Sequence, residues 1–148
     1  MQWINQLQGQ IVGLDTAPLI YFVEENQTYL QMVDPFFEAL GRGEFTVVTS
    51  AVTLLEALVQ PLRRGDTMLA QQYRDILFNQ EGLTMIEVSP DIAETAAQLR
   101  AIHNIQSLDA IQLATAIRGG AAFFLTNDVR LPSSLPGLTV LLLDELSS

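Results

Sequence analysis

Short apolar runs alternate along the chain with longer stretches of helical periodicity. The runs are continuously apolar instead of alternating with polar residues, which is typical of strands buried on both faces of a parallel sheet. The segments between them repeat apolar residues at helical spacing and are long enough to cross over the sheet. We therefore expect an α/β fold, with a central parallel five-stranded sheet and helices on both faces. The predicted strands are 10–15, 45–49, 84–88, 121–126 and 138–143.

Local signals place the ends of the helices. Pro18 lies early in a helical stretch, where its missing N–H costs little, and glycines at 41 and 43 end that stretch. Ser50 is a predicted N-cap, and Gly65 ends the helix that follows it. The other predicted helices are 66–79, a helix from Pro90 to about His103, and 108–117 with Ser107 as its N-cap; residues 131–137 are expected to form a loop.

The length of 148 residues fits a single domain, here residues 1–148 with 1–10 as an N-terminal extension. In this extension Trp3, Ile4 and Leu7 are expected to pack on the core. No apolar stretch approaches the roughly 18 residues of a membrane span. The first residues lack the basic and apolar regions of a signal peptide, and the chain has no Cys for disulfides. We therefore expect a cytoplasmic protein that does not enter a membrane.

The charge balance limits the chemistry. The chain has 17 acidic residues, seven Arg and no Lys, for a net charge of −10. A broad basic surface for nucleic acid is excluded, and so are mechanisms that depend on Lys. Carboxylates that hold divalent cations can still act on phosphate esters, because the ions reverse the local field.

Four acids occupy equivalent places in the strand and helix pattern. Asp15 and Asp128 come at or just after strand ends, whereas Glu56 and Asp109 lie early in helices. Ligands of parallel α/β sheets bind at the carboxyl ends of strands, so these acids are expected to converge. Such carboxylates need a compensating cation, and an all-oxygen set favours Mg²⁺ or Mn²⁺. Taken singly, each acid also has an ordinary interpretation, such as an N-cap for Asp15, a favourable dipole position for Asp109 or a turn for Asp128.

The segments that carry these acids resemble the PIN domain family, and especially the VapC-type toxin ribonucleases. They are GLDTAPLIYF (13–22), TSAVTLLEAL (49–58), SLDAIQLATA (107–116) and FLTNDVRL (124–131). The resemblance implies a pocket for one or two Mg²⁺ or Mn²⁺ ions and hydrolysis of single-stranded RNA. It assigns Asp15, Glu56 and Asp109 to the main ion, and Asp128 to a second ion or the attacking water. The supporting residues that it implies are Thr16, Thr126 and Asn127.

The resemblance also implies partners. VapC-type toxins pair with a small antitoxin, which here is expected to offer Arg or Lys to the acidic pocket. A homodimer is expected through the apolar face of 66–79, formed by Met68, Leu69, Tyr73, Ile76 and Leu77. Ala17 departs from the Asn or Ser that many family members have at this position. This difference keeps an alternative open, a catalytically inactive PIN-fold module that binds RNA or protein.

Overall fold

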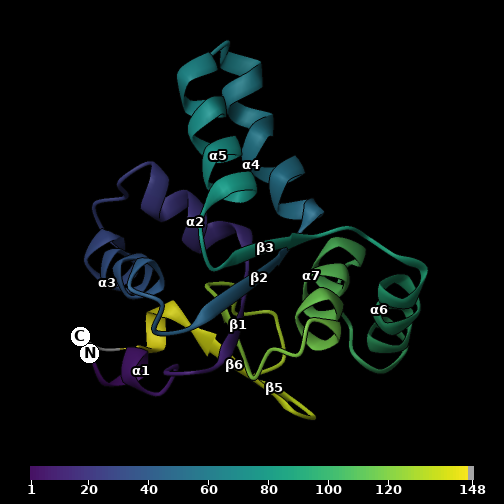
Figure 1. Cartoon of the computed structure of the whole chain (residues 1–148). Coiled ribbons are helices and arrows are strands. Elements are labelled where there is room, and N and C mark those ends of the chain that lie inside the picture. The colour runs from purple at the N-terminus through teal and green to yellow at the C-terminus, as the bar shows by residue number, and fades with distance from the viewer. Residues whose placement is uncertain (147–148) are drawn as a thin grey trace.

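A six-stranded sheet forms the centre of the computed structural model, which describes residues 1–146 (Figure 1). The strand order is β3-β2-β1-β4-β6-β5, and all neighbouring pairs are parallel except β5 with β6. The predicted α/β class with a mainly parallel sheet is confirmed. The strands are β1 (Ile11–Leu14), β2 (Thr46–Ser50), β3 (Leu83–Ile86), β4 (Phe123–Thr126), β5 (Ser134–Leu135) and β6 (Leu138–Leu142).

Helices cover both faces of this sheet, and each face has its own apolar core (Figure 1). One core lies beneath α1 to α5, and the other lies beneath α6 and α7. The paired helices α4 and α5 project beyond the sheet as a hairpin. The helices are α1 (Gln2–Asn5), α2 (Thr16–Val23), α3 (Leu30–Gly41), α4 (Ala51–Arg64), α5 (Thr67–Asn79), α6 (Pro90–Ile102), α7 (Ser107–Arg118) and the 3₁₀ turn η1 (Leu143–Glu145).

The long helical stretch predicted to end at residue 41 is in fact two helices, α2 and α3. Glu25 adopts a left-handed φ of 53° between them. The side chain of Asn26 then accepts hydrogen bonds from the backbone N–H groups of Thr28 and Tyr29, at 2.9 and 3.1 Å. These bonds replace helical ones, because a short polar side chain competes locally for backbone donors.

The prediction of five strands and of a loop at 131–137 is wrong in one respect. Ser134 and Leu135 form a sixth strand, which pairs antiparallel with β6 at the sheet edge. Gly137 allows the tight turn between these strands, since it adopts a φ of 76° that favours glycine. A two-residue strand is too short to produce a recognisable apolar pattern.

Two predicted helix caps have different outcomes. Ser50 caps α4 as expected, with its hydroxyl accepting from the N–H of Val52 at 3.0 Å. The prediction that Ser107 caps α7 is wrong, because Gln106 is the N-cap residue and Ser107 is the first helical residue. The hydroxyl of Ser107 instead accepts a hydrogen bond from Nη1 of Arg100 at 2.9 Å, which joins α6 to α7.

The N-terminal residues pack on the core as expected. Trp3, Ile4 and Leu7 are all buried, and the Trp3 ring stacks on Phe36 of α3. In the described residues 1–146, no helix is long and apolar enough to cross a membrane.

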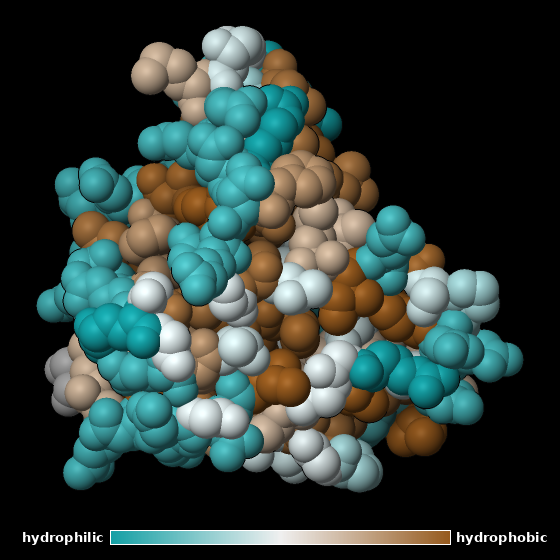
Figure 2. Space-filling model, viewed as in Figure 1, coloured by the Kyte–Doolittle hydropathy of each residue, from teal (hydrophilic) through white to brown (hydrophobic). Residues whose placement is uncertain are grey.

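The apolar face of α5 mostly serves the protein's own core. Tyr73 and Leu77 are fully buried, whereas Met68 is 82% exposed. Of the face predicted to form a homodimer surface, Tyr73 and Leu77 are therefore not available to a second copy. The hairpin nevertheless presents apolar side chains along one flank (Figure 2). Its exposed large apolar residues are Leu55, Leu62, Met68 and Phe78.

Gly13 allows α7 to approach the sheet closely. A Cβ atom on this residue would lie 2.6 Å from Cβ of Ala116 and 2.8 Å from Cδ1 of Phe124. Both contacts are too short, so we expect Gly13→Ala to lower the free energy of unfolding by about 1–3 kcal/mol through overpacking. Urea denaturation measures this loss. Gly41→Ala is the control, since its Cβ atom would meet nothing within 4 Å; equal stability of the two variants would contradict the prediction.

Candidate active site

The four acids singled out in the sequence line one pocket at the carboxyl ends of β1 and β4. Asp15 directly follows β1 and is the N-cap residue of α2, and Asp128 lies two residues after β4. Glu56 lies in α4, and Asp109 lies in the first turn of α7. The pocket has a volume of about 340 Å³ and is also lined by Thr16, Ala17, Ile20, Asn127 and Arg130.

Asp15 is held by two hydrogen bonds. Its Oδ1 accepts from the N–H of Thr16 at 2.8 Å, and its Oδ2 accepts from the hydroxyl of Thr126 at 2.7 Å. The pKa of Asp15 is raised to about 6, mainly by burial and to a smaller extent by the charges of Asp109 and Glu56, while the two hydrogen bonds offset part of the increase. This carboxylate is therefore oriented but lacks sufficient positive compensation.

Glu56 is oriented by a chain of buried polar groups. The hydroxyl of Thr16 donates to Oε1 of Glu56 at 2.7 Å. Nε2 of Gln112 in α7 donates to the hydroxyls of Thr16 and Thr53, at 3.2 and 2.8 Å. Sequence reasoning missed Thr53 and Gln112. Their signal in the sequence is a polar side chain within an otherwise apolar helical run. The structure shows that both side chains are buried.

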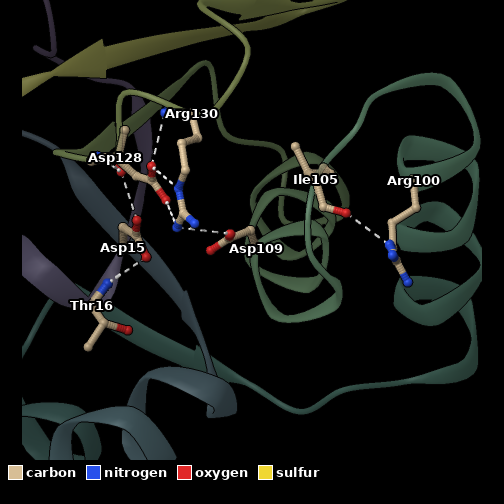
Figure 3. Close-up of polar contacts among 8 residues, drawn as sticks. Asp15, Thr16, Arg100, Ile105, Asp109, Asp128 and Arg130 are labelled. Atoms are coloured by element: carbon tan, nitrogen blue, oxygen red, sulfur yellow. Dashed lines mark hydrogen bonds and ion pairs between the residues drawn. The ribbon is translucent and has the colours of Figure 1, made fainter.

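Asp128 and Asp109 face a cation from their own chain, Arg130 (Figure 3). Oδ1 of Asp128 accepts from Nε of Arg130 at 2.9 Å and from its backbone N–H at 3.0 Å, and Oδ2 accepts from Nη2 at 2.8 Å. The same Nη2 lies 3.8 Å from Oδ2 of Asp109. Sequence reasoning missed Arg130, for which the only signal was its place two residues after Asp128.

The two acids respond differently to this guanidinium. Hydrogen bonds from Arg130 hold the pKa of Asp128 below its usual value. The pKa of Asp109 is raised, mainly by burial and then by the charge of Asp128, and the more distant Arg130 offsets only part of this increase. Asp128 thus has a compensating positive charge, whereas Asp15 and Asp109 are poorly compensated.

The sequence profile of the PIN domain family matches residues 12–133, which include all four acids. The chain belongs to the PIN domain family. A search of curated protein sequences found no significant match.

Solved structures share the fold of this PIN domain. The chain is similar to VapBC2 from Rickettsia felis bound to a promoter DNA fragment, with 21% identity, coverage of 88% of this chain and 96% of the other, and a TM-score of 0.68. A toxin–antitoxin complex from Klebsiella pneumoniae has 22% identity, coverage of 88% and 96%, and a TM-score of 0.63. Mycobacterium tuberculosis VapC20, described as a toxin that cleaves the sarcin–ricin loop, has 18% identity, coverage of 77% and 86%, and a TM-score of 0.63.

The donor groups of this PIN domain fit a hard divalent cation. Every acidic group in the pocket offers oxygen, and Asp15 is largely buried beside two further carboxylates without a cation of its own. As the side chains stand, no three acids or imidazoles within residues 1–146 are grouped closely enough to hold an ion. In this arrangement the guanidinium of Arg130 binds Asp128 and faces Asp109.

The three residues expected to support the acids have different contacts. Thr16 and Thr126 bond directly to Glu56 and Asp15, and the hydroxyl of Thr126 also accepts from the N–H of Asp128 at 3.0 Å. Asn127 lines the pocket but bonds elsewhere, donating to the Tyr21 hydroxyl and accepting from the N–H of Asp144. It therefore joins the end of β4 to α2 and η1.

If the acids only repelled one another, removing the charge of any one of them would stabilise the metal-free protein. Asp128 is the exception, because it is paired with Arg130. We expect Asp128→Asn to lower the free energy of unfolding in EDTA by ~0.2–1 kcal/mol at neutral pH, because the Arg130 side chain of the ion pair is largely exposed and solvent weakens the attraction. Urea denaturation of parent and variant measures the change. A clear gain in stability would show that repulsion from Asp109 exceeds attraction by Arg130.

Proposed function

We propose that this PIN domain is an Mg²⁺- or Mn²⁺-dependent endoribonuclease that hydrolyses phosphodiester bonds of single-stranded RNA. The observation that carries the proposal is the pocket itself, where partly buried Asp15 lies with Glu56, Asp109 and Asp128 at the carboxyl edge of the sheet. Four converging carboxylates are unfavourable in a purely structural role. They suit a site that binds cations and works on phosphate esters.

Each residue has a distinct task in this proposal. Asp15, Glu56 and Asp109 would hold the main ion, and Asp128 would hold a second ion or orient the attacking water. An ion held there would lower the pKa of a water molecule and would stabilise the charge that develops on the phosphate. Thr126 donates a hydrogen bond to Asp15 and Thr16 donates one to Glu56, so both carboxylates are restrained at the pocket.

We also propose that the protein is the toxin of a type II toxin–antitoxin pair. The Klebsiella structure is a toxin–antitoxin complex, the Rickettsia structure is VapBC2 bound to promoter DNA, and both share the fold of this chain. An acidic pocket is suited to an inhibitory partner that offers Arg or Lys to its carboxylates. A homodimer remains a further proposal, supported by exposed Leu55, Leu62 and Phe78 on the α4–α5 hairpin.

A cleavage assay tests the proposed activity. Purified protein is incubated with a mixed pool of single-stranded RNAs in Mg²⁺ or Mn²⁺, and with the same RNAs in EDTA. We expect products with 5′-phosphate ends only when the metal is present. Cleavage in EDTA that Asp15→Ala does not reduce would indicate a contaminating nuclease and defeat the proposal.

A binding module without turnover is the second candidate. It is favoured by Arg130, which already satisfies Asp128, and by Ala17, whose side chain offers the pocket no hydrogen bond. Absence of cleavage in a protein that binds Mn²⁺ by calorimetry would favour this candidate over the nuclease.

A further inference from the structure

One cation lies among the pocket acids, and it comes from the loop after β4. Arg130 makes a two-pronged contact with Asp128, in which Nε and Nη2 donate to separate carboxylate oxygens at 2.9 and 2.8 Å. Nη2 also faces Asp109 across 3.8 Å (Figure 3). The guanidinium is thus placed between the carboxylates of the β4 loop and α7, where a metal ion would have to meet them.

We propose that Arg130 is a built-in counter-cation that occupies part of the metal site, and that a metal ion must displace its side chain to bind. The inference rests on the proposed function, because it concerns the same four carboxylates. It assigns Arg130 a role in setting metal affinity, which is separate from any role in the reaction.

The geometry allows such a displacement. The side chain of Arg130 is 64% exposed, so it can move into solvent without opening the core. Asp128 also accepts a hydrogen bond from the backbone N–H of Arg130, and Thr126 accepts one from the backbone N–H of Asp128. These backbone contacts keep the loop and the Asp128 carboxylate in place after the guanidinium leaves.

The distribution of charge in the pocket implies that the need to displace the Arg130 side chain lowers the affinity for a metal ion. Arg130 is paired with Asp128 and approaches Asp109, whereas Asp15 and Glu56 have no ion pair in the described part of the chain. An entering ion can bind Asp15 and Glu56 directly. It gains Asp109 and Asp128 only in competition with a guanidinium, whose paired N–H groups match a carboxylate well.

Calorimetric titration with Mn²⁺ alone tests the inference, using the intact chain, Arg130→Gln and a control with the same net charge. Arg118→Gln is that control, because Arg118 lies at the far end of α7 and pairs loosely with Asp91 at 3.8 Å. We expect the dissociation constant for Mn²⁺ to be roughly three- to tenfold lower in Arg130→Gln than in the parent, and within about twofold of the parent in Arg118→Gln. Thermal midpoints should show the same order, with Mn²⁺ raising that of Arg130→Gln most.

The outcomes separate this inference from the proposed function. Equal Mn²⁺ affinity of parent and Arg130→Gln would overturn the inference while leaving the metal site intact. An equal gain in both Arg variants would also overturn it, since net charge alone would explain the result. No binding by any of the three proteins would overturn the proposed metal site, and the inference with it.

Discussion

Replacement of Asp15 by Asn is expected to lower the rate of RNA cleavage by roughly 10²–10³-fold, because metal-centred charge stabilisation contributes several kcal/mol to such reactions. Asp15 is the acid most enclosed by the pocket, and its carboxylate is oriented by Thr16 and Thr126. Asn removes the charge but keeps nearly the same shape. The measurement is the initial rate on a labelled single-stranded RNA in saturating Mn²⁺.

This substitution separates the two interpretations of Asp15. Asn is as good an N-cap as Asp, so α2 should still begin after residue 15. If Asp15 were only a cap, the variant would retain a rate within about threefold of the parent. Asp91→Asn is the matched control, because this exposed acid of α6 lines no part of the pocket. A comparable loss of activity in Asp91→Asn would mean that general charge, and not the pocket, determines the rate.

The sequence was sufficient to predict the convergence of the acids, because that convergence depends on topology. Continuous apolar runs indicated parallel strands, and the carboxyl ends of parallel strands meet at one edge. Asp15 and Asp128 follow the adjacent strands β1 and β4, so their proximity requires no knowledge of side-chain geometry. The helical acids Glu56 and Asp109 join them because α4 and α7 begin near that same edge.

The contacts among these side chains were beyond sequence reasoning. Gln112 reaches Thr53 across 59 positions of sequence, and only the packing of α7 against α4 brings them together. Arg130 is only two residues from Asp128. The sequence does not show whether its side chain folds back on that acid, as it does here, or extends into solvent. Strand β5 was missed for a similar reason, because two residues carry no periodicity.

Ionisation of Asp15 is also expected to have a large effect on the free energy of unfolding of the metal-free protein. The carboxyl titrates at pKa 3.8 in the unfolded chain and at about 6 in the folded protein, where burial is the main cause of the increase. The folded state therefore holds more protons than the unfolded state between these values, and stability falls as pH rises through that window. The full loss, present above about pH 6, is roughly 3 kcal/mol, since each pH unit of displacement contributes about 1.4 kcal/mol.

Urea denaturation in EDTA between pH 4 and pH 8 measures this loss in the parent, in Asp15→Asn and in Asp91→Asn. We expect the free energy of unfolding of the parent and of Asp91→Asn to decrease between about pH 4 and 6, and that of Asp15→Asn to change much less. Asp109, whose pKa is also raised, should leave a smaller slope of the same sign in Asp15→Asn. Parallel profiles for all three proteins would contradict the assignment of the slope to Asp15.

Saturating Mn²⁺ should reverse the behaviour of the parent. A bound cation favours the ionised carboxylate, so the folded-state pKa of Asp15 is expected to fall and the loss of stability above pH 6 to disappear. Asp15→Asn should gain less from the same concentration of Mn²⁺, because it lacks the charge that the ion compensates. The unfavourable burial of Asp15 in the metal-free protein then has a physical explanation, as a negative site whose stability depends on the cation that it binds.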